Sequence, residues 1–425
     1  MGFVEELEKA FREGGHLREG QALPATDVGA GDGWGRSEGN IGIGTKNGAV
    51  VGLAARYCGL SSLPESIGQL SELEQLDLTG NNLTTLPESL GNLANLRKLY
   101  LDQNQLASLP ESLGLLSGLV ELHLDNNHLT KLPARIGGLA SLEMLNLHNN
   151  RLRGLPVALG RLSSLKEINI DGNQLEALPE SLWQLTHLHT LNIGENHFAS
   201  VPDAVGNLTR LHTMDLGHNK LTRLPESIGK LRELTYFLYV SNNQLSELPR
   251  SLENLSKLRY LNITHNRFSE LPDWIGSLAG LRELRLYNNA ITSLPESIGN
   301  LANLKELHAM NNRLITLPES LGRLGALKEL RLNDNRLSSL PESIGELERL
   351  TTLDLRNNSL PALPAAIGRL RNLAFLDLRA NRLFALPEEL GELPRLEKLD
   401  LRWNKLAVVP EWIQRLEVRG CSVYR

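Results

Sequence analysis

The chain has 425 residues, a formal net charge of −5 and 41% hydrophobic residues, but aromatic residues make up only 4%. Lys and Arg do not gather in runs, so the sequence lacks the electrostatic footprint of a protein that binds nucleic acid or an anionic membrane. No apolar run reaches 18 residues, which predicts no membrane insertion. The two cysteines, Cys58 and Cys421, are typical of a reducing compartment and predict no disulfide framework.

Residues 1–20 predict a short amphipathic helix, because Phe3, Leu7, Ala10 and Phe11 recur at helical spacing. The helix either docks on the structure that follows it or recruits a partner, and we expect docking. This stretch is acidic and has no apolar core of the kind that signal peptides contain, so no secretory signal is predicted.

Residues 21–47 are rich in glycine and predict a linker, with a capping hairpin as the alternative for its last part. Asn47-Gly48 suits a two-residue turn between the apolar residues at 41 and 43 and those at 50 and 51. Such a hairpin would cover the edge of a sheet. The segment GIGTKNG matches neither known phosphate-binding glycine motif, so no nucleotide site is expected here.

Residues 48–411 contain sixteen copies of a 23-residue unit. In residues 86–108 the template LxxLxLxxNxL is filled by Leu96, Leu99, Leu101, Asn104 and Leu106. Cysteine replaces the template asparagine at Cys58, and the asparagine then recurs at Asn81, Asn104, Asn127, Asn150, Asn173, Asn196, Asn219, Asn243, Asn266, Asn289, Asn312, Asn335, Asn358, Asn381 and Asn404. Self-similarity at this period predicts a solenoid.

The chemistry of the unit predicts its local structure. The alternation in Leu99-Tyr100-Leu101 has period two, so a short strand should turn its leucines inward. The amide of Asn104 should bond to backbone groups of adjacent copies. Pro110 suits the start of a helical or 3₁₀ turn. One copy cannot fold alone, so the copies must stack.

One copy of the repeat is one residue longer than the others. Between Asn219 and Asn243 the spacing is 24 residues, and the leucine pattern places the extra residue near Thr235-Tyr236. An insertion there predicts a bulge that redirects neighbouring side chains.

The template together with LPxxIGxLxxL resembles the leucine-rich repeats of the Ras-group, intracellular scaffold type, over about residues 48–416. The resemblance implies an α/β solenoid: a right-handed superhelix, shaped as a horseshoe or arc, with a concave parallel β-sheet and short helical or 3₁₀ segments on the convex side. It also implies a scaffold or regulator whose protein partners can include small GTPases and phosphatases. Residues 412–425, with apolar Trp412, Ile413 and Leu416, predict a C-terminal cap.

An aromatic cluster is the first candidate binding site. If the leucines of each strand point inward, aromatic residues from consecutive copies face outward from the concave strands, with a histidine beside them. These residues are Phe237, Tyr239, Tyr260, His265 and Tyr287. Aromatic side chains supply much of the contact energy at protein interfaces. The alternative is mutual packing that stabilises the sheet face.

An arginine stripe is the second candidate. Arg356, Arg379 and Arg402 lie beside a column of aspartates in the last copies, and the two columns can pair across neighbouring strands. Either the charges neutralise one another in solvent, or the arginines bind acidic groups of a partner.

An acidic end is the third feature. It contains Asp102, Asp125 and Asp171 with His123 and His148. Nothing in their spacing fixes a coordination sphere, and no catalytic signature occurs, so we predict no catalytic, cofactor-binding or metal-binding residues.

The sequence therefore predicts a cytoplasmic, monomeric, non-enzymatic protein without a cofactor, which binds other proteins on its concave face. The alternative is a secreted bacterial effector whose repeats recognise a host protein, because the glycine-rich N-terminal arm would suit a secretion signal. An enzyme acting at the concave face is a third and weaker hypothesis.

Overall fold

The computed structural model describes residues 2–13, 18–19, 21–27 and 40–425. The chain forms two compact units, Met1–Phe198 and Ala199–Arg425. Residues 28–39 of the expected linker lie outside the described residues, as do the side chains of Phe3 and Ala10 in the N-terminal helix.

In the first unit, short strands alternate with 3₁₀ helices along the chain. The described strands and the α-helix are α1 (Gly2–Glu13), β1 (Ala25–Asp27), β2 (Ile41–Lys46), β3 (Ala49–Ala55), β4 (Gln75–Asp77), β5 (Lys98–Tyr100), β6 (Glu121–His123), β7 (Met144–Asn146), β8 (Glu167–Asn169) and β9 (Thr190–Asn192). The 3₁₀ helices are η1 (Glu65–Gln69), η2 (Glu88–Asn92), η3 (Glu111–Leu115), η4 (Ala134–Gly138), η5 (Val157–Arg161) and η6 (Glu180–Gln184).

The second unit repeats the same alternation and ends in a short α-helix and a strand. Its strands and α-helix are β10 (Thr213–Asp215), β11 (Phe237–Tyr239), β12 (Tyr260–Asn262), β13 (Glu283–Arg285), β14 (Glu306–His308), β15 (Glu329–Arg331), β16 (Thr352–Asp354), β17 (Phe375–Asp377), β18 (Lys398–Asp400), α2 (Trp412–Val418) and β19 (Ser422–Tyr424). The 3₁₀ helices are η7 (Asp203–Asn207), η8 (Glu226–Lys230), η9 (Arg250–Asn254), η10 (Asp273–Ser277), η11 (Glu296–Asn300), η12 (Glu319–Arg323), η13 (Glu342–Glu346), η14 (Ala365–Arg369) and η15 (Glu388–Glu392).

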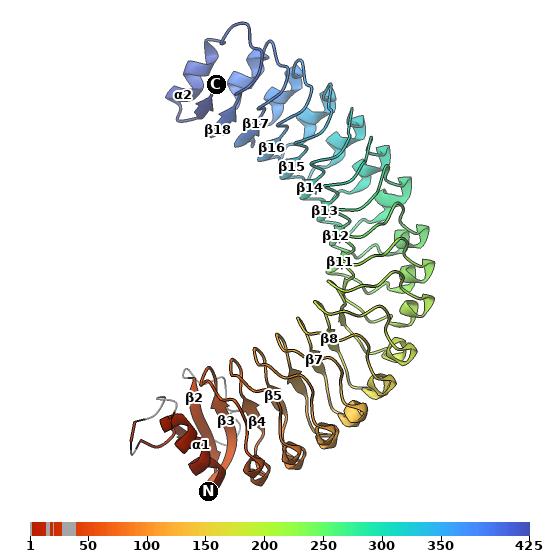
Figure 1. Ribbon diagram of the computed structural model, residues 1–425. Helices are drawn as coiled ribbons and strands as arrows, with labels where there is room; N and C mark the ends of the chain where they lie inside the picture. Colours follow the sequence, from red (N-terminus) through yellow and green to blue (C-terminus); the bar gives the residue numbers. More distant parts are fainter. Residues whose placement is uncertain (1, 14–17, 20, 28–39) are drawn as a thin grey trace. The chain divides into compact units, whose positions relative to one another are not determined.

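The strands of each unit form an open sheet in chain order. Neighbouring repeat strands are parallel and in register; for example, Leu261 in β12 pairs with Leu284 in β13. Within each unit the strands lie on one side and the 3₁₀ helices on the other, as Figure 1 shows. The middle residue of each repeat strand from β4 to β18, such as Leu261, is buried between these two layers. The predicted solenoid of parallel strands and 3₁₀ segments is confirmed.

The template asparagines form the predicted ladder of amides, which are buried in most copies and half-buried at Asn266, Asn289 and Asn404. Asn104 donates from Nδ2 to the carbonyl oxygens of Leu78 and Leu101, both at 3.0 Å, and its Oδ1 accepts from the backbone N–H of Leu83 at 3.1 Å. Leu78 and Leu83 belong to the preceding copy. Each asparagine therefore pairs backbone groups that would otherwise be buried without partners.

The 3₁₀ helices are linked from copy to copy by glutamates. Glu226, at the start of η8, accepts hydrogen bonds from the backbone N–H groups of Arg250 (3.2 Å) and Ser251 (3.0 Å) at the start of η9. N–H groups at a helix start have no partner inside the helix. The glutamate of one copy thus caps the helix of the next.

At the N-terminal end, α1 packs against η1 and buries Leu7 and Phe11. Glu8 accepts a hydrogen bond from the backbone N–H of Leu23 at 2.9 Å, and Ser66 of η1 donates to Glu6. The helix ends at Glu13 and is shorter than the predicted segment 1–20.

On the N-terminal side of the repeat strands, the first unit adds a hairpin and one more strand. β2 and β3 are antiparallel, with Asn47 and Gly48 between them in the left-handed region at φ of 52° and 80°. β3 also pairs with the repeat strand β4, and β2 pairs with β1. β1 lies within the segment 21–47, for which a linker was predicted.

The second unit ends in α2 and β19. α2 buries Trp412, Ile413 and Leu416, and β19 pairs with β18 in parallel. Val418 closes the helix, and the strand begins at Ser422. Pairing with β18 covers the last edge that the repeats would leave open.

The extra residue of the long repeat lies where the sequence places it. The carbonyl oxygen of His212 accepts both Thr235 N–H (3.2 Å) and Tyr236 N–H (2.9 Å), and the regular pairing of β11 then begins at Phe237. In the next copy, Arg259 and Tyr260 donate separately to the carbonyl oxygens of Thr235 and Tyr236, both at 3.0 Å. The insertion is therefore accommodated just before the strand.

Candidate functional site

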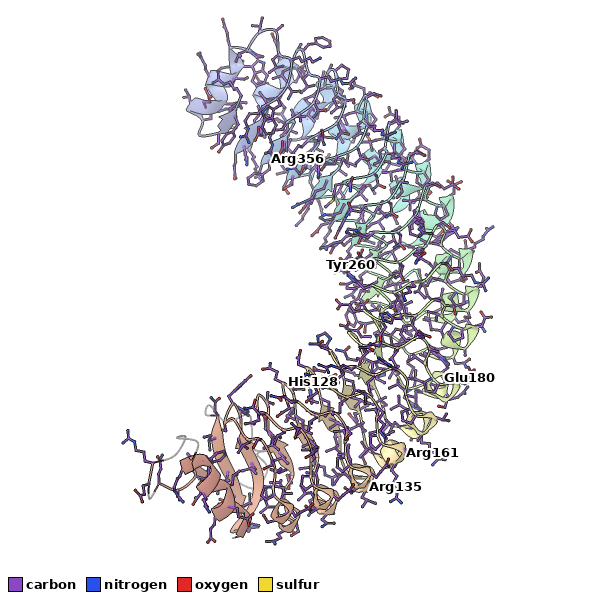
Figure 2. All side chains as sticks on the ribbon, viewed as in Figure 1. His128, Arg135, Arg161, Glu180, Tyr260 and Arg356 are labelled. Carbon is purple, nitrogen blue, oxygen red and sulfur yellow. The ribbon has the colours of Figure 1, made fainter. Side chains whose placement is uncertain are left out.

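The candidate site lies on the strand side of the second unit. The first and third residues of each repeat strand from β10 to β18 project from this side, because the middle residue is buried. Figure 2 shows Tyr260 and Arg356 on this side, opposite the 3₁₀ helices. Leu238, Val240, Leu261, Ile263, Leu284 and Leu286 are fully buried, which confirms the register on which the predicted site depends.

Phe237, Tyr239 and Tyr260 form one aromatic cluster. The rings of Phe237 and Tyr239, both in β11, are stacked with their centroids 4.3 Å apart. The ring of Tyr260 in β12 meets Tyr239 edge to face at 4.8 Å. All three side chains are half-buried. The cluster thus offers a rigid apolar surface that is still accessible from the strand side.

Charged groups border this cluster on its β13 side. The guanidinium of Arg285 lies over the ring of Tyr260 at 5.2 Å and donates from Nε to Glu283 Oε1 at 2.6 Å. Burial raises the pKa of Tyr260, and the negative charge of Glu283 raises it further. The phenol therefore stays protonated at neutral pH and can donate a hydrogen bond to a ligand.

His265 and Tyr287 form a separate pair. Their rings meet edge to face at 5.6 Å, and the side-chain amide of Asn288 lies 2.7 Å from Nε2 of His265. Tyr287 is half-buried and His265 is exposed. The structure thus divides the predicted aromatic residues into a cluster of three and a pair.

Tyr236 is an exposed aromatic residue that the sequence analysis did not assign to the site. Its ring is 55% exposed, meets His212 edge to face at 6.2 Å and lies under the guanidinium of Arg259 at 5.7 Å. It directly precedes Phe237. The extra residue of the long repeat could have identified it, because an inserted position does not follow the repeat's inward and outward pattern.

The arginine stripe is engaged by its own aspartates. Arg379 pairs with Asp377 of its own strand at 2.5 Å and with Asp400 of the next strand at 3.4 Å. Arg402 pairs with Asp400 at 2.6 Å, while Arg356 lies 3.9 Å from Asp354.

Asp400 shows how strongly these pairs act. The residue is 0% exposed, and its burial alone would raise its pKa. Hydrogen bonds from Arg402 and the positive charges of Arg379 and Arg402 outweigh burial, so its pKa is lowered. Arg402 also lies over the ring of Tyr424 at 5.2 Å. Arg379 and Arg402 are thus paired with aspartates of the sheet face, while the Arg402 side chain remains 38% exposed.

The acidic end of the first unit has a structural use. Asp102 accepts a hydrogen bond from the backbone N–H of Asp125 at 2.9 Å, and Asp125 accepts one from the backbone N–H of His148 at 2.8 Å. Burial raises the pKa of both carboxyl groups. His148 lies 3.3 Å from Asp171. These hydrogen bonds join successive copies. They explain why aspartates occur at these positions, and no bound ligand is needed to explain them.

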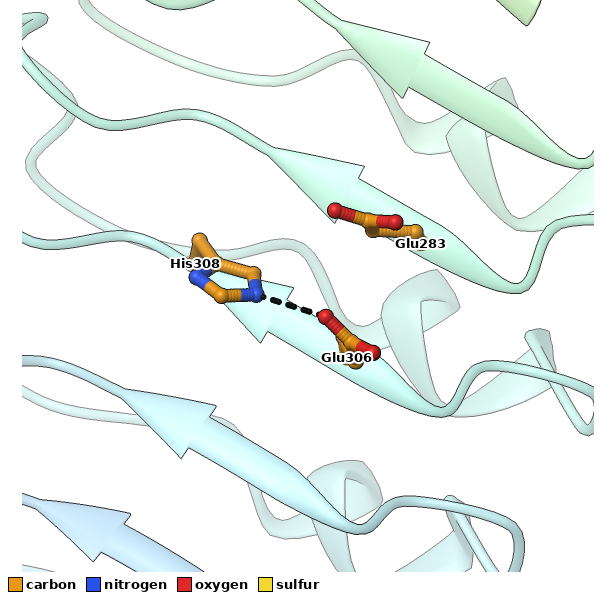
Figure 3. Close-up of side chains that lie close together, drawn as sticks. All are labelled: Glu283, Glu306 and His308. Atoms are coloured by element: carbon orange, nitrogen blue, oxygen red, sulfur yellow. Dashed lines mark hydrogen bonds and ion pairs between the residues drawn. The ribbon is translucent and has the colours of Figure 1, made fainter.

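A further group on the strand side was missed. Glu283, Glu306 and His308 lie close together on β13 and β14, as Figure 3 shows. The sequence carries a signal for this group, because Glu283 and Glu306 are 23 residues apart and so occupy the same position of neighbouring copies.

None of the helices formed by the described residues is long and apolar enough to cross a bilayer.

The comparisons with known proteins agree with this architecture. A family model described as a leucine-rich repeat region matches residues 175–258, 242–335 and 317–417, and one described as leucine rich repeat matches residues 56–106 and 117–175. No curated protein matches the chain.

Solved structures are similar over most of the chain. A leucine-rich-repeat protein of Leptospira interrogans is 32% identical, with a TM-score of 0.75, over 87% of this chain and 94% of its own. The plant peptide hormone receptor RGFR1, solved with RGF2, is 30% identical over 88% of this chain and 66% of its own, with a TM-score of 0.71.

The Arabidopsis receptor kinase HAESA was solved with the peptide hormone IDA and the co-receptor SERK1. It is 29% identical over 85% of this chain and 63% of its own, with a TM-score of 0.70. From the family models, the repeat geometry and the likeness to the Leptospira protein, the chain belongs to the leucine-rich-repeat family.

Proposed function

We propose that the chain is a non-enzymatic scaffold or regulator that binds a partner protein on the strand side of its second unit. The contact surface centres on Phe237, Tyr239 and Tyr260, and Tyr236 and the pair of His265 and Tyr287 extend it. The single observation that carries the proposal is the contact of three half-buried rings on two adjacent strands, in a chain with few aromatic residues.

The physical argument is one of preorganisation. Ring contacts and the flanking guanidinium of Arg285 hold Tyr260 in place, so little conformational entropy is lost when a partner packs on it. Tyrosine offers both an apolar ring and a hydroxyl donor, which is why it is frequent at binding hot spots.

The family supports binding over catalysis. Its fold is typical of non-enzymatic binding scaffolds, and two of the similar receptors were solved with peptide hormones bound. A partner segment that lies across the strands would contact residues from several copies at once. Small GTPases and phosphatases, which the resemblance implies as partners, are the first purified proteins to test.

We extend the proposal to a cytoplasmic monomer. Cys58 and Cys421 are free and buried, and burial raises the pKa of Cys58 to about 11, so its thiol stays protonated and unreactive. Free thiols are typical of a reducing compartment. Light scattering measures the oligomeric state, and fractionation of the producing cell measures the location.

A secreted bacterial effector that recognises a host protein is the second candidate. The observation in its favour is the 32% identity to the protein of Leptospira interrogans. Fusing residues 1–47 to a reporter and measuring its export separates the two candidates, because only the effector hypothesis expects export.

Affinity capture followed by titration tests the proposal. The wild-type chain, immobilised, should capture the partner, and the purified partner is then titrated against Tyr260→Ala and Arg379→Ala. We expect Tyr260→Ala to weaken binding and Arg379→Ala to leave it nearly unchanged, because Arg379 is already paired with Asp377. The reverse result would assign the site to the arginine stripe.

A further inference from the structure

Three adjacent strands of the second unit carry nearly the same tripeptide. β13 and β15 read Glu-Leu-Arg, whereas β14 reads Glu-Leu-His. Register pairs Glu283 with Glu306 and Glu306 with Glu329, so three glutamates occupy one column. The next column on the same side contains Arg285, His308 and Arg331.

In the two outer strands each glutamate pairs with the arginine two residues further along. Arg285 Nε lies 2.6 Å from Glu283 Oε1, and Arg331 makes the corresponding ion pair with Glu329. In the middle strand the partner is His308, whose Nε2 lies 3.1 Å from Glu306 Oε2. Histidine thus replaces the guanidinium at this one position of the three.

The replacement changes the electrostatics of the column. Glu306 lies between two other carboxylates, and like charges directly opposite on neighbouring strands destabilise a sheet. A guanidinium always carries a positive charge, but an imidazole can be neutral and can offer a lone pair to a metal ion. The middle strand therefore lacks a permanent cation at the position where the flanking strands have one.

The geometry brings three ligand atoms together at this position. One oxygen from each of Glu283 and Glu306 and one ring nitrogen of His308 lie within 4.8 Å of one another (Figure 3). His308 is 7% exposed and both glutamates are half-buried. Ligands of one Zn²⁺ ion are at most about 4 Å apart, since each bond is ~2.1 Å. Rotation of the flexible glutamate side chains would close the remaining gap.

From these observations we propose that Glu283, Glu306 and His308 bind one divalent transition-metal ion, for which Zn²⁺ fits best. One imidazole and two carboxylates match the ligand types of zinc sites with three protein ligands and an open fourth position. The ion supplies the positive charge that the middle strand lacks. Arg285, released from Glu283, keeps its contact with the ring of Tyr260. The inference does not depend on the proposed partner site.

Metal titration of the full chain tests the proposal. The protein, without an affinity tag, is treated with a chelator and titrated with Co²⁺, whose visible absorption reports an imidazole and carboxylate environment. Zn²⁺ is then added as a competitor and measured by calorimetry. We expect one equivalent of either ion and a rise in the unfolding midpoint with added Zn²⁺.

The chain offers matched variants. His308→Arg gives β14 the tripeptide of its neighbours, so it should keep the fold and restore a Glu-Arg pair while removing the nitrogen ligand. We expect it, and also Glu306→Gln and Glu283→Gln, to weaken binding by more than about 10–100-fold, the loss typical of merely disturbing a metal site's outer shell. Glu329→Gln removes a carboxylate from the same column outside the ligand set and should bind like wild type.

Two results together support the site. The wild-type chain binds one equivalent saturably, and His308→Arg weakens this binding by more than about 10–100-fold while its unfolding transition without metal is unchanged. The proposal is wrong if the wild-type chain shows no saturable binding. It is also wrong if His308→Arg binds as tightly as wild type, or if Glu329→Gln loses as much affinity as Glu306→Gln.

Discussion

An added Cβ on Gly299 of η11 would lie 2.3 Å from the carbonyl oxygen of Ser320 in η12. The two 3₁₀ helices therefore approach each other at backbone contact, and only a glycine leaves room. The same relationship recurs between Gly91 and Ser112 at 2.5 Å. This spacing explains the glycine of the LPxxIGxLxxL motif as a packing requirement.

Gly299→Ala should destabilise the second unit by about 1–3 kcal/mol, the usual cost of overpacking a close contact. Chemical denaturation followed by circular dichroism measures the change. Gly325→Ala is the control, because a Cβ there meets nothing within 4 Å and should have little effect. Equal midpoints for the two variants would show that the helices can move apart at little cost.

The amide ladder predicts a comparable loss at Asn312. Its Oδ1 accepts from the backbone N–H of Ile291 at 3.0 Å, and its Nδ2 donates to the carbonyl oxygen of Leu286 at 3.1 Å. Asn312→Ala leaves these buried groups unpaired and should cost about 1–3 kcal/mol. Arg313→Ala, an exposed neighbour, should be nearly silent. A silent Asn312→Ala would refute the ladder's energetic role.

A left-handed position offers a stabilising change. Ala380 has φ of 52°, and the equivalent residues Asn311 and Asn357 are asparagines. Asparagine tolerates this region better than alanine, so Ala380→Asn should raise the free energy of unfolding by about 0.5–1 kcal/mol. Ala385→Asn, on an exposed loop, is the control. A loss of stability in Ala380→Asn would contradict this explanation.

The glutamate caps predict a pH dependence. The hydrogen bond from the backbone N–H of Ser251 is the largest cause that lowers the pKa of Glu226 below its ordinary value of 4.5. A lowered folded-state pKa contributes stability above the unfolded-state pKa, and that stability is lost as pH falls through the folded-state value.

Glu226→Gln should therefore flatten the fall of the unfolding midpoint below about pH 4.5, relative to wild type. Thermal unfolding measured between neutral pH and acid gives the two slopes. Glu247→Gln, an exposed glutamate outside the 3₁₀ helices, controls for the change in net charge. Identical acid slopes in wild type and Glu226→Gln would mean that this cap does not contribute.

The repeat register could be read from the sequence because its period is strict. A 23-residue spacing of leucines and asparagines defines which side of each strand is buried, and one slip between Asn219 and Asn243 locates the insertion. The outward placement of Tyr239 and Tyr260 follows directly from the burial of Leu238 and Leu261.

Side-chain pairing could not be read in the same way. Arg379 reaches both Asp377 on its own strand and Asp400 on the next, a choice that depends on rotamers rather than on register. The strand β1 was also missed, because Ala25–Asp27 is too short and polar to show an alternating pattern. Its pairing partner, β2, lies beyond residues 28–39 in the sequence.

The central claim is that Tyr260 anchors a partner protein on the strand side of the second unit. Its most direct test is the dissociation constant of the captured partner for wild type and for Tyr260→Ala. The unfolding midpoints of the two proteins are measured as well and must be equal, so that a loss of binding is not due to unfolding. Truncating an aromatic hot spot costs about 2 kcal/mol, so we expect roughly thirtyfold weaker binding at ~1.4 kcal/mol per decade. An unchanged constant for Tyr260→Ala, with binding lost in Arg379→Ala, would contradict the account.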